Sequence, residues 1–97
     1  MRFSWDERKN RANVRKHGIR FDAAIRVFDD RFALVLQDRE VDGEIRWQLL
    51  GKANEAVLLV AHVYEEDGNE ERIRIISARK ATSREAKEYH AQFYSGR

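Results

Sequence analysis

The segment Ala56–Tyr64, AVLLVAHVY, constrains the fold more than any other part of the chain. Successive side chains of a β-strand point to opposite faces of a sheet, and this segment is apolar on both. Turn residues flank it in GKANE and EEDGNE. These features predict a strand at the centre of a sheet. The run is far too short to span a bilayer, so no membrane segment is expected.

Three further segments are predicted to pair beside this central strand. Ile45–Leu50 and Glu71–Ser77 alternate between apolar and polar residues, whereas Phe32–Gln37 is short and apolar. The linkers are short and rich in turn residues, which favours an antiparallel β-meander. Alternation puts Arg46 and Gln48 on one face of their strand. In the last strand one face is predicted to carry Ile73, Ile75 and Ser77, and the other Arg72, Arg74 and Ile76.

The N-terminal part predicts a short strand at Phe3–Trp5 and then a helix. Asp6 suits the N-cap of that helix, since a short acidic side chain can accept from the first free backbone N–H groups. The helix should end near His17, because Gly18 fits the left-handed position that follows a helix.

A second helix is predicted from Phe21-Asp22 to Asp29-Asp30, with Asp22 as its cap. Its apolar face consists of Ala24, Val27 and Phe28. Because only a few residues join the two helices, they should form a helical hairpin.

The last helix follows Thr82-Ser83-Arg84-Glu85, which matches the capping box. Its apolar stripe is predicted to comprise Ala86, Tyr89, His90 and Phe93. The predicted class is therefore α+β: a short N-terminal strand, a helical hairpin, a curved antiparallel β-meander and a C-terminal helix. We expect residues 1–97 to form a single domain.

Composition and motifs exclude several classes of function. The chain has no cysteine, which fits a reducing cytoplasm, and its first residues lack the apolar core of a secretory signal. It contains no phosphate-binding GxxxxGK[ST], no GxGxxG, no HExxH and no GxSxG. The three histidines are far apart in sequence. We therefore expect a cytoplasmic protein with no cofactor and no metal.

The net charge of +2 conceals a strong asymmetry along the chain. Residues 1–26 hold 8 Lys/Arg and 3 Asp/Glu, residues 27–71 hold 4 and 12, and residues 72–97 hold 7 and 2. If the two basic ends lie together, they form a positive face that attracts polyanions, above all nucleic acid. Alternatively, the opposite charges simply neutralise each other across the surface.

The charged residues suffice for cleaving RNA without a metal. That reaction needs a base for the 2′-hydroxyl, cations for the phosphate and an acid for the leaving 5′-oxygen. The candidate cations are Lys16, Arg46, Arg74, Arg79 and Lys80, and the candidate proton carriers are His17, His62, Glu85 and Tyr89.

Each of these residues also has a structural explanation. Arg74 can solvate the outer face of a strand, and Arg79 and Lys80 can be ordinary turn residues. Glu85 is explained by the capping box, and Tyr89 by its place on the apolar stripe. His62 fits a core position, and His17 suits the negative end of its helix.

Two long signatures resemble those of the BrnT family. WDERKNRANVRKHGIRFDAA (Trp5–Ala24) contains the W-D, the K-H-G and the F-x-x-A of the opening signature. RIRIISARKAT, followed by Glu85 and Tyr89, resembles the closing R-I-I-S-A-R and E-x-x-x-Y. Val27-Phe28-Asp29-Asp30 and Arg46 with Gly51 also look like that family. The resemblance extends from Phe3 to about Tyr89.

The resemblance implies a RelE-like fold and a type II toxin that cleaves RNA to arrest translation and growth. Its partner would be a cognate ribbon-helix-helix antitoxin (BrnA-like), which blocks the toxin and through which alone the complex binds operator DNA. The chain departs from the family in the hairpin HVYEEDGNEER, which is more acidic than expected. This loop could meet a basic stretch of antitoxin instead of RNA.

The resemblance narrows the candidate site to the polar positions that match the two signatures. Catalysis is assigned to His17, Arg46, Arg74 and Arg79, and RNA binding to Lys16 and Lys80. Glu85 and Tyr89 would combine structural and site roles. Two rival interpretations remain: a non-catalytic module that binds RNA or protein with the same basic face, and a structural subunit whose charge serves only solubility.

Overall fold

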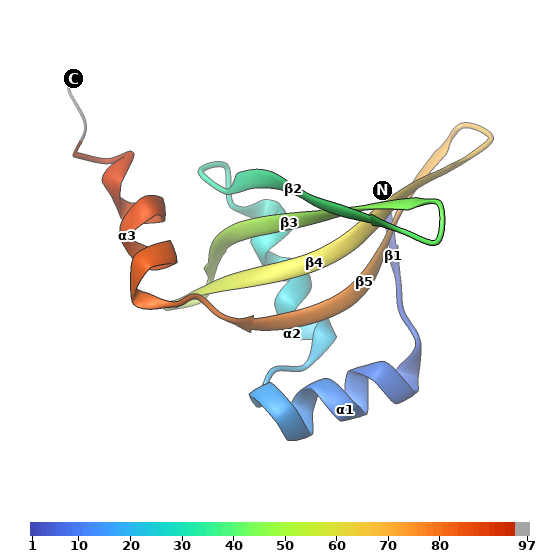
Figure 1. The fold of residues 1–97 in the computed structure, drawn as a ribbon, viewed down its shortest axis with the longest axis horizontal. Coiled ribbons are helices and arrows are strands. Elements are labelled where there is room, and N and C mark those ends of the chain that lie inside the picture. Colours follow the sequence, from blue (N-terminus) through green and yellow to red (C-terminus); the bar gives the residue numbers. More distant parts are fainter. Residues whose placement is uncertain (95–97) are drawn as a thin grey trace.

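The computed structural model describes residues 1–94 and contains five strands and three α-helices (Figure 1). A short 3₁₀ helix, η1, continues directly from α2. In chain order the elements are β1 (Arg2–Ser4), α1 (Glu7–His17), α2 (Phe21–Ala24), η1 (Ile25–Asp29), β2 (Leu34–Val41), β3 (Glu44–Ala53), β4 (Ala56–Asp67), β5 (Glu70–Lys80) and α3 (Ser83–Ala91). The α+β class and its layout are as predicted.

The five strands form one sheet in the order β1-β5-β4-β3-β2. β4 lies in the middle, which confirms the central strand predicted from Ala56–Tyr64. β2 to β5 form the predicted antiparallel meander, and β1 adds to the edge of β5 in parallel. The prediction at Phe32–Gln37 was misplaced, because β2 begins at Leu34 and reaches Val41. The first strand likewise spans Arg2–Ser4 and stops before Trp5.

The first helix follows the predicted pattern and the second does not. Asp6 caps α1 by accepting from the backbone N–H of Arg8, and Gly18 ends it with φ of 72°. α2 has only four residues, and its N-cap is Arg20, with no capping side-chain bond. Asp22 instead forms an exposed ion pair with Arg20. The prediction of Asp22 as a cap was therefore wrong.

The sheet is covered unequally on its two faces. On the face that carries Trp47 and His62, here called the tryptophan face, α2 and η1 pack over the larger core. That core includes Phe21, Ala24, Val27, Leu49, Val60 and Ile75. On the opposite face α3 packs over a small core of Leu50, Leu59 and Tyr89. Figure 1 shows α3 at the end of the sheet where β5 finishes, so it covers only part of this second face.

The last helix begins with the predicted capping box, in which Thr82 and Glu85 exchange hydrogen bonds. Its apolar stripe is narrower than predicted. Tyr89 is buried and Ala86 is partly buried, but His90 and Phe93 are exposed. The exposed rings instead form edge-on contacts at the surface, where Phe93 meets Phe32 and Tyr89.

A β-bulge in β5 decides which arginines share a face. Ala61 pairs with Ser77 and His62 pairs with Ile75, so Ile76 is an extra residue between them. The bulge reverses the alternation beyond this point. Ser77 therefore shares a face with Arg74, and its predicted place beside Ile73 and Ile75 was wrong.

The free edge of β5 is closed by a side chain of α1. Asn13 is buried, donates to the carbonyls of Ile19 and Ala78, and accepts from the backbone N–H of Ala78. Its amide thus replaces the neighbouring strand that Ala78 lacks. Asn10 is also buried and accepts from the N–H of Phe21. The bonds between Asn13 and Ala78 fix α1 along the sheet edge, where Figure 1 shows it beside β5. No helix within residues 1–94 is both long and apolar enough to cross a membrane.

Candidate functional site

Three predicted arginines project from the face opposite Trp47 and His62. Arg46 pairs with Val63, and Val63 pairs with Arg74, so the two arginines flank one buried valine. Arg79 pairs with Leu59 and points to the same side because of the bulge. We call this surface, defined by Arg46, Arg74 and Arg79, the arginine face. Strict alternation would have put Arg74 and Arg79 on opposite faces, since they are an odd number of residues apart.

Arg74 is held between two carboxylates. Its Nη2 donates to both oxygens of Glu44 at 2.7 and 2.8 Å, and its Nε lies 3.4 Å from Glu65. The hydrogen bond that Arg74 donates to Glu44 raises the pKa of Arg74. Sequence reasoning missed both carboxylates. Glu44 stands two residues before Arg46, so strand alternation alone could have put it on this face.

Arg46 lies beside this pair and has no carboxylate partner among residues 1–94. Its Nε is buried and has no hydrogen-bond partner within the described part of the chain. An unpaired buried donor is costly, and such a group in a native structure calls for an explanation. The terminal nitrogens of this guanidinium are not among its buried unpartnered atoms, and they can bind an incoming anionic oxygen.

Arg79 is joined to the last helix. Its two terminal nitrogens donate to the two oxygens of Glu85 at 2.9 and 3.0 Å. Glu85 also caps its helix by accepting from the N–H of Thr82. The Arg79 guanidinium, helped by Thr82, lowers the pKa of Glu85 to about 2, so this carboxyl is ionised at neutral pH. Glu85 thus positions Arg79 and is unsuited to donate a proton.

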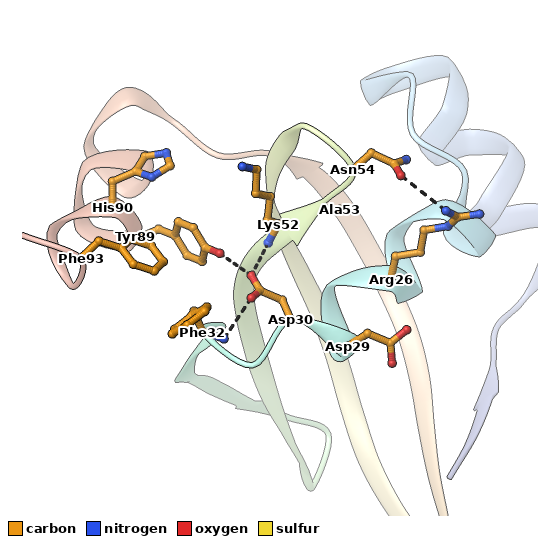
Figure 2. Close-up of a pocket in the computed structure, with 10 residues that line it drawn as sticks. All are labelled: Arg26, Asp29, Asp30, Phe32, Lys52, Ala53, Asn54, Tyr89, His90 and Phe93. Atoms are coloured by element: carbon orange, nitrogen blue, oxygen red, sulfur yellow. Dashed lines mark hydrogen bonds between the residues drawn. The ribbon is translucent and has the colours of Figure 1, made fainter.

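Tyr89 anchors the last helix and does not face the arginines as a free phenol. Its hydroxyl donates to Asp30 at 2.5 Å, a contact visible at the centre of Figure 2. Burial and this bond raise the pKa of Tyr89 to about 12. Burial alone would raise the pKa of Asp30, but bonds from Tyr89 and from the N–H groups of Lys52 and Phe32 lower it.

Gly51 makes the approach of Asp30 possible. A Cβ at Gly51 would lie 3.0 Å from Ala33, 3.3 Å from Val27 and 3.4 Å from the Asp30 carboxylate. The close contact lets the loop after η1 reach β3. Asp30 and Gly51 are separate positions of the family resemblance. In the structure they act together, because both help to hold Tyr89 and α3 in place.

The two histidine candidates lie away from the arginines. His17 ends α1 at the edge of the sheet, and within residues 1–94 it makes no hydrogen bond, ion pair or ring contact with any of the three. His62 points to the tryptophan face, where its ring meets Phe28 edge-on. Burial lowers the pKa of His62. The structure thus puts the three predicted arginines on one face, with Glu85 bonded to Arg79, but it puts neither histidine beside them.

The predicted RNA-binding lysines are both exposed. Lys16 lies in the last turn of α1 and Lys80 ends β5. Because α1 lies along β5, the two basic ends of the chain are neighbours, as one of the two charge interpretations required (Figure 1). Among residues 1–94, no three side chains of the metal-binding types converge on a possible ion site.

An α+β domain with several guanidiniums on one sheet face belongs to the class of proteins equipped to bind anions. The family comparison is more specific. Residues 5–85 match the family described as the ribonuclease toxin, BrnT, of type II toxin-antitoxin systems, and the chain belongs to that family. It is therefore a toxin of the ribonuclease type with an antitoxin as its partner. No curated protein shows significant similarity to the chain.

Proposed function

We propose that this toxin is a metal-independent endoribonuclease and that RNA is cut on the arginine face. Arg46, Arg74 and Arg79 bind the scissile phosphate and stabilise the negative charge that grows on it as the 2′-hydroxyl attacks. The 2′-oxygen forms a bond to phosphorus, and the bond to the 5′-oxygen breaks. The products are a 2′,3′-cyclic phosphate and a 5′-hydroxyl.

The observation that carries this proposal is that the bulge at Ile76 puts all three arginines on one face of the sheet. Carboxylates orient Arg74 and Arg79. Arg46 has a buried Nε without a partner within residues 1–94. Partly exposed ion pairs contribute little, so a phosphate can replace Glu44 or Glu85 at modest cost. Fixed guanidiniums also match the geometry of phosphate oxygens.

The path of the RNA follows the basic edge formed by α1 and the end of β5. Lys16 and Lys80 contact flanking phosphates. His17 carries the proton, because histidine is the side chain most suited to proton exchange at neutral pH, and this role requires its ring to reach the scissile phosphate when RNA is bound. RNA that crosses from α1 to the arginine face passes this end of the helix. His17→Ala should therefore change the pH dependence of cleavage, whereas Lys16→Ala should mainly raise the RNA concentration required.

The direct test is cleavage of RNA by the purified toxin in the presence of EDTA. We expect cutting with cyclic phosphate ends, and about a hundredfold loss or more in Arg74→Ala. Arg72→Ala is the matched control, because Arg72 shares the strand and the face but pairs with Asp67 at the tip of the hairpin. Cleavage that requires an added divalent metal would refute the mechanism. RNA that is bound but never cut would favour a non-catalytic binding module.

We further propose that the antitoxin has a ribbon-helix-helix DNA-binding domain and is encoded by the neighbouring gene. The complex would bind operator DNA through the antitoxin, because the cations of the toxin belong to its proposed RNA site. Coexpression tests this proposal: the neighbouring protein should restore growth and copurify with the toxin. A neighbour of another fold class would contradict it.

A further inference from the structure

The tryptophan face is open beyond the end of its helices. The helical layer reaches Phe28, and past it lies an apolar cavity of about 380 Å³. The cavity is lined by Met1, Phe28, Val35, Trp47, His62 and Tyr64. Val35 is 62% exposed, and on the same face Tyr64 and Ile45, which lie near Trp47, are both more than 40% exposed. Contiguous apolar surface of this kind marks a site of interaction in soluble proteins.

The rim of this open surface is acidic. Strand register puts Glu40, paired with Ile45, on the tryptophan face, together with Glu66 and Glu71. Tyr64 and Glu71 are diagonal neighbours on this face, and the Glu71 carboxylate raises the pKa of Tyr64. Along β3, β4 and β5, all within the described residues, the only basic side chain on this face is Lys80, at the far end.

From these features we propose that the open part of the tryptophan face docks a segment of the antitoxin in which apolar side chains are flanked by Lys or Arg. The apolar residues enter the cavity beside Trp47 and Tyr64, and the basic residues meet Glu40, Glu66 and Glu71. The inference deepens the proposed function, since it names where the antitoxin is held and by what chemistry.

Other occupants fit this surface less well. An RNA backbone would meet three carboxylates, and like charges across an interface are strongly unfavourable. A second copy of this chain related by twofold symmetry would bring two acidic rims together, because such an interface uses the same patch on both partners. A protein that also binds operator DNA is expected to carry the basic residues that the rim requires.

The test measures binding of the antitoxin encoded beside this chain to purified toxin variants. Glu40→Lys/Glu66→Lys should weaken the affinity at low salt by about tenfold or more, and the loss should shrink as salt rises. Glu55→Lys/Glu88→Lys is the matched control, since it makes the same charge change at two exposed sites outside this face. We expect that control to change the affinity by less than about threefold.

A second variant tests the apolar contribution. Val35→Thr/Ile45→Thr keeps both side chains β-branched but makes them more polar, and it should also reduce antitoxin affinity, by about tenfold. RNA cleavage by each free toxin variant is measured in parallel and should match the wild type. A toxin that cuts no RNA at all would refute the proposed function but leave the affinity comparison intact.

Three results would overturn the inference. In the first, both double variants bind the antitoxin as tightly as the control. In the second, RNA affinity falls in Val35→Thr/Ile45→Thr, which would assign the face to RNA. In the third, sedimentation shows a wild-type dimer that these substitutions dissociate, which would assign it to a second copy of the chain.

Discussion

The two faces of one sheet carry opposite chemistry within a few residues of each other. Arg46 and Arg74 lie on one face, and their strand neighbours Trp47 and Ile73 lie on the other. The arginine face has cations in a partly covered setting, whereas the open tryptophan face has apolar groups bordered by acids. The alternation of side chains along β3, β4 and β5 therefore presents one surface suited to a polyanion and another suited to a basic protein.

The two faces also differ in whether their charged side chains form ion pairs. On the arginine face, Arg74 and Arg79 are fixed by carboxylates that hold the guanidiniums in one orientation. On the tryptophan face, Glu40 and Glu66 make no ion pair within residues 1–94. Guanidiniums fixed in one orientation suit a reaction site, where geometry matters. The carboxylates around the open tryptophan face suit a surface that attracts a charged partner.

The largest effect is expected from Arg46→Met. The change keeps the apolar stem over Val63 but removes the charge, so cleavage should fall by about 10²–10³-fold in kcat. Folding should be unharmed or improved, because the substitution removes a buried Nε that has no partner. RNA cleavage assays and urea unfolding measure the two quantities.

Arg46→Lys serves as the control, since it restores charge without the planar fork and should recover only part of the rate. If Arg46→Met cuts RNA normally while remaining folded, the arginine face is not the cleavage site, and the comparison of the two faces loses its functional meaning.

The next largest effect is expected on stability, from the loss of the hydrogen bond between Tyr89 and Asp30 that holds α3 on the sheet. Tyr89→Phe removes the hydroxyl that donates to Asp30 and should lower the free energy of unfolding by about 2 kcal/mol. Tyr94→Phe is the control, because Tyr94 is 85% exposed, and it should change stability by less than about 0.5 kcal/mol. Equal stability of the two variants in urea unfolding would show that α3 is not held by this bond.

A smaller effect is expected on the free energy of unfolding at acidic pH, where Glu85 becomes protonated. Its pKa is lowered from 4.5 to about 2, so ionised Glu85 stabilises the folded state above about pH 4.5 and this contribution disappears as the pH falls toward 2. After allowance for solvent screening, the contribution is about 1–2 kcal/mol.

Glu85→Gln gives the matched measurement. The variant should already be less stable near neutral pH, and its stability should fall less than that of the wild type between about pH 5 and pH 2. Parallel curves for the two proteins would mean that the bond to Arg79 contributes nothing to folding.

Much of the fold follows from local pattern. Asp6, Gly18 and the capping box at Thr82 use short-range rules, and the apolar run in β4 identifies the central strand. The second helix was misjudged because an acidic residue near a helix start can pair with a neighbouring side chain instead of the backbone. Asp22 does this with Arg20.

The candidate site was only partly predictable for a different reason. The three arginines were found by type, but their common face depends on an extra residue in β5 that no periodicity marks. The partners of Arg74 and Tyr89 come from other strands and loops, and Asn13 lies on a helix without a clear apolar stripe. Such contacts depend on register between segments that are distant in sequence.

The smallest effect is expected for the stability of a substitution at the exposed part of the tryptophan face. Val35→Thr should change the free energy of unfolding by no more than about 0.5 kcal/mol, because Val35 is largely exposed and threonine keeps its branched shape. Val60→Thr, at a fully buried site in β4, should cost about 1–3 kcal/mol, since its hydroxyl would be placed among apolar neighbours. Urea unfolding of the two variants measures both. A cost at Val35 as large as that at Val60 would mean that this surface is covered within the toxin itself, leaving no open face for a partner.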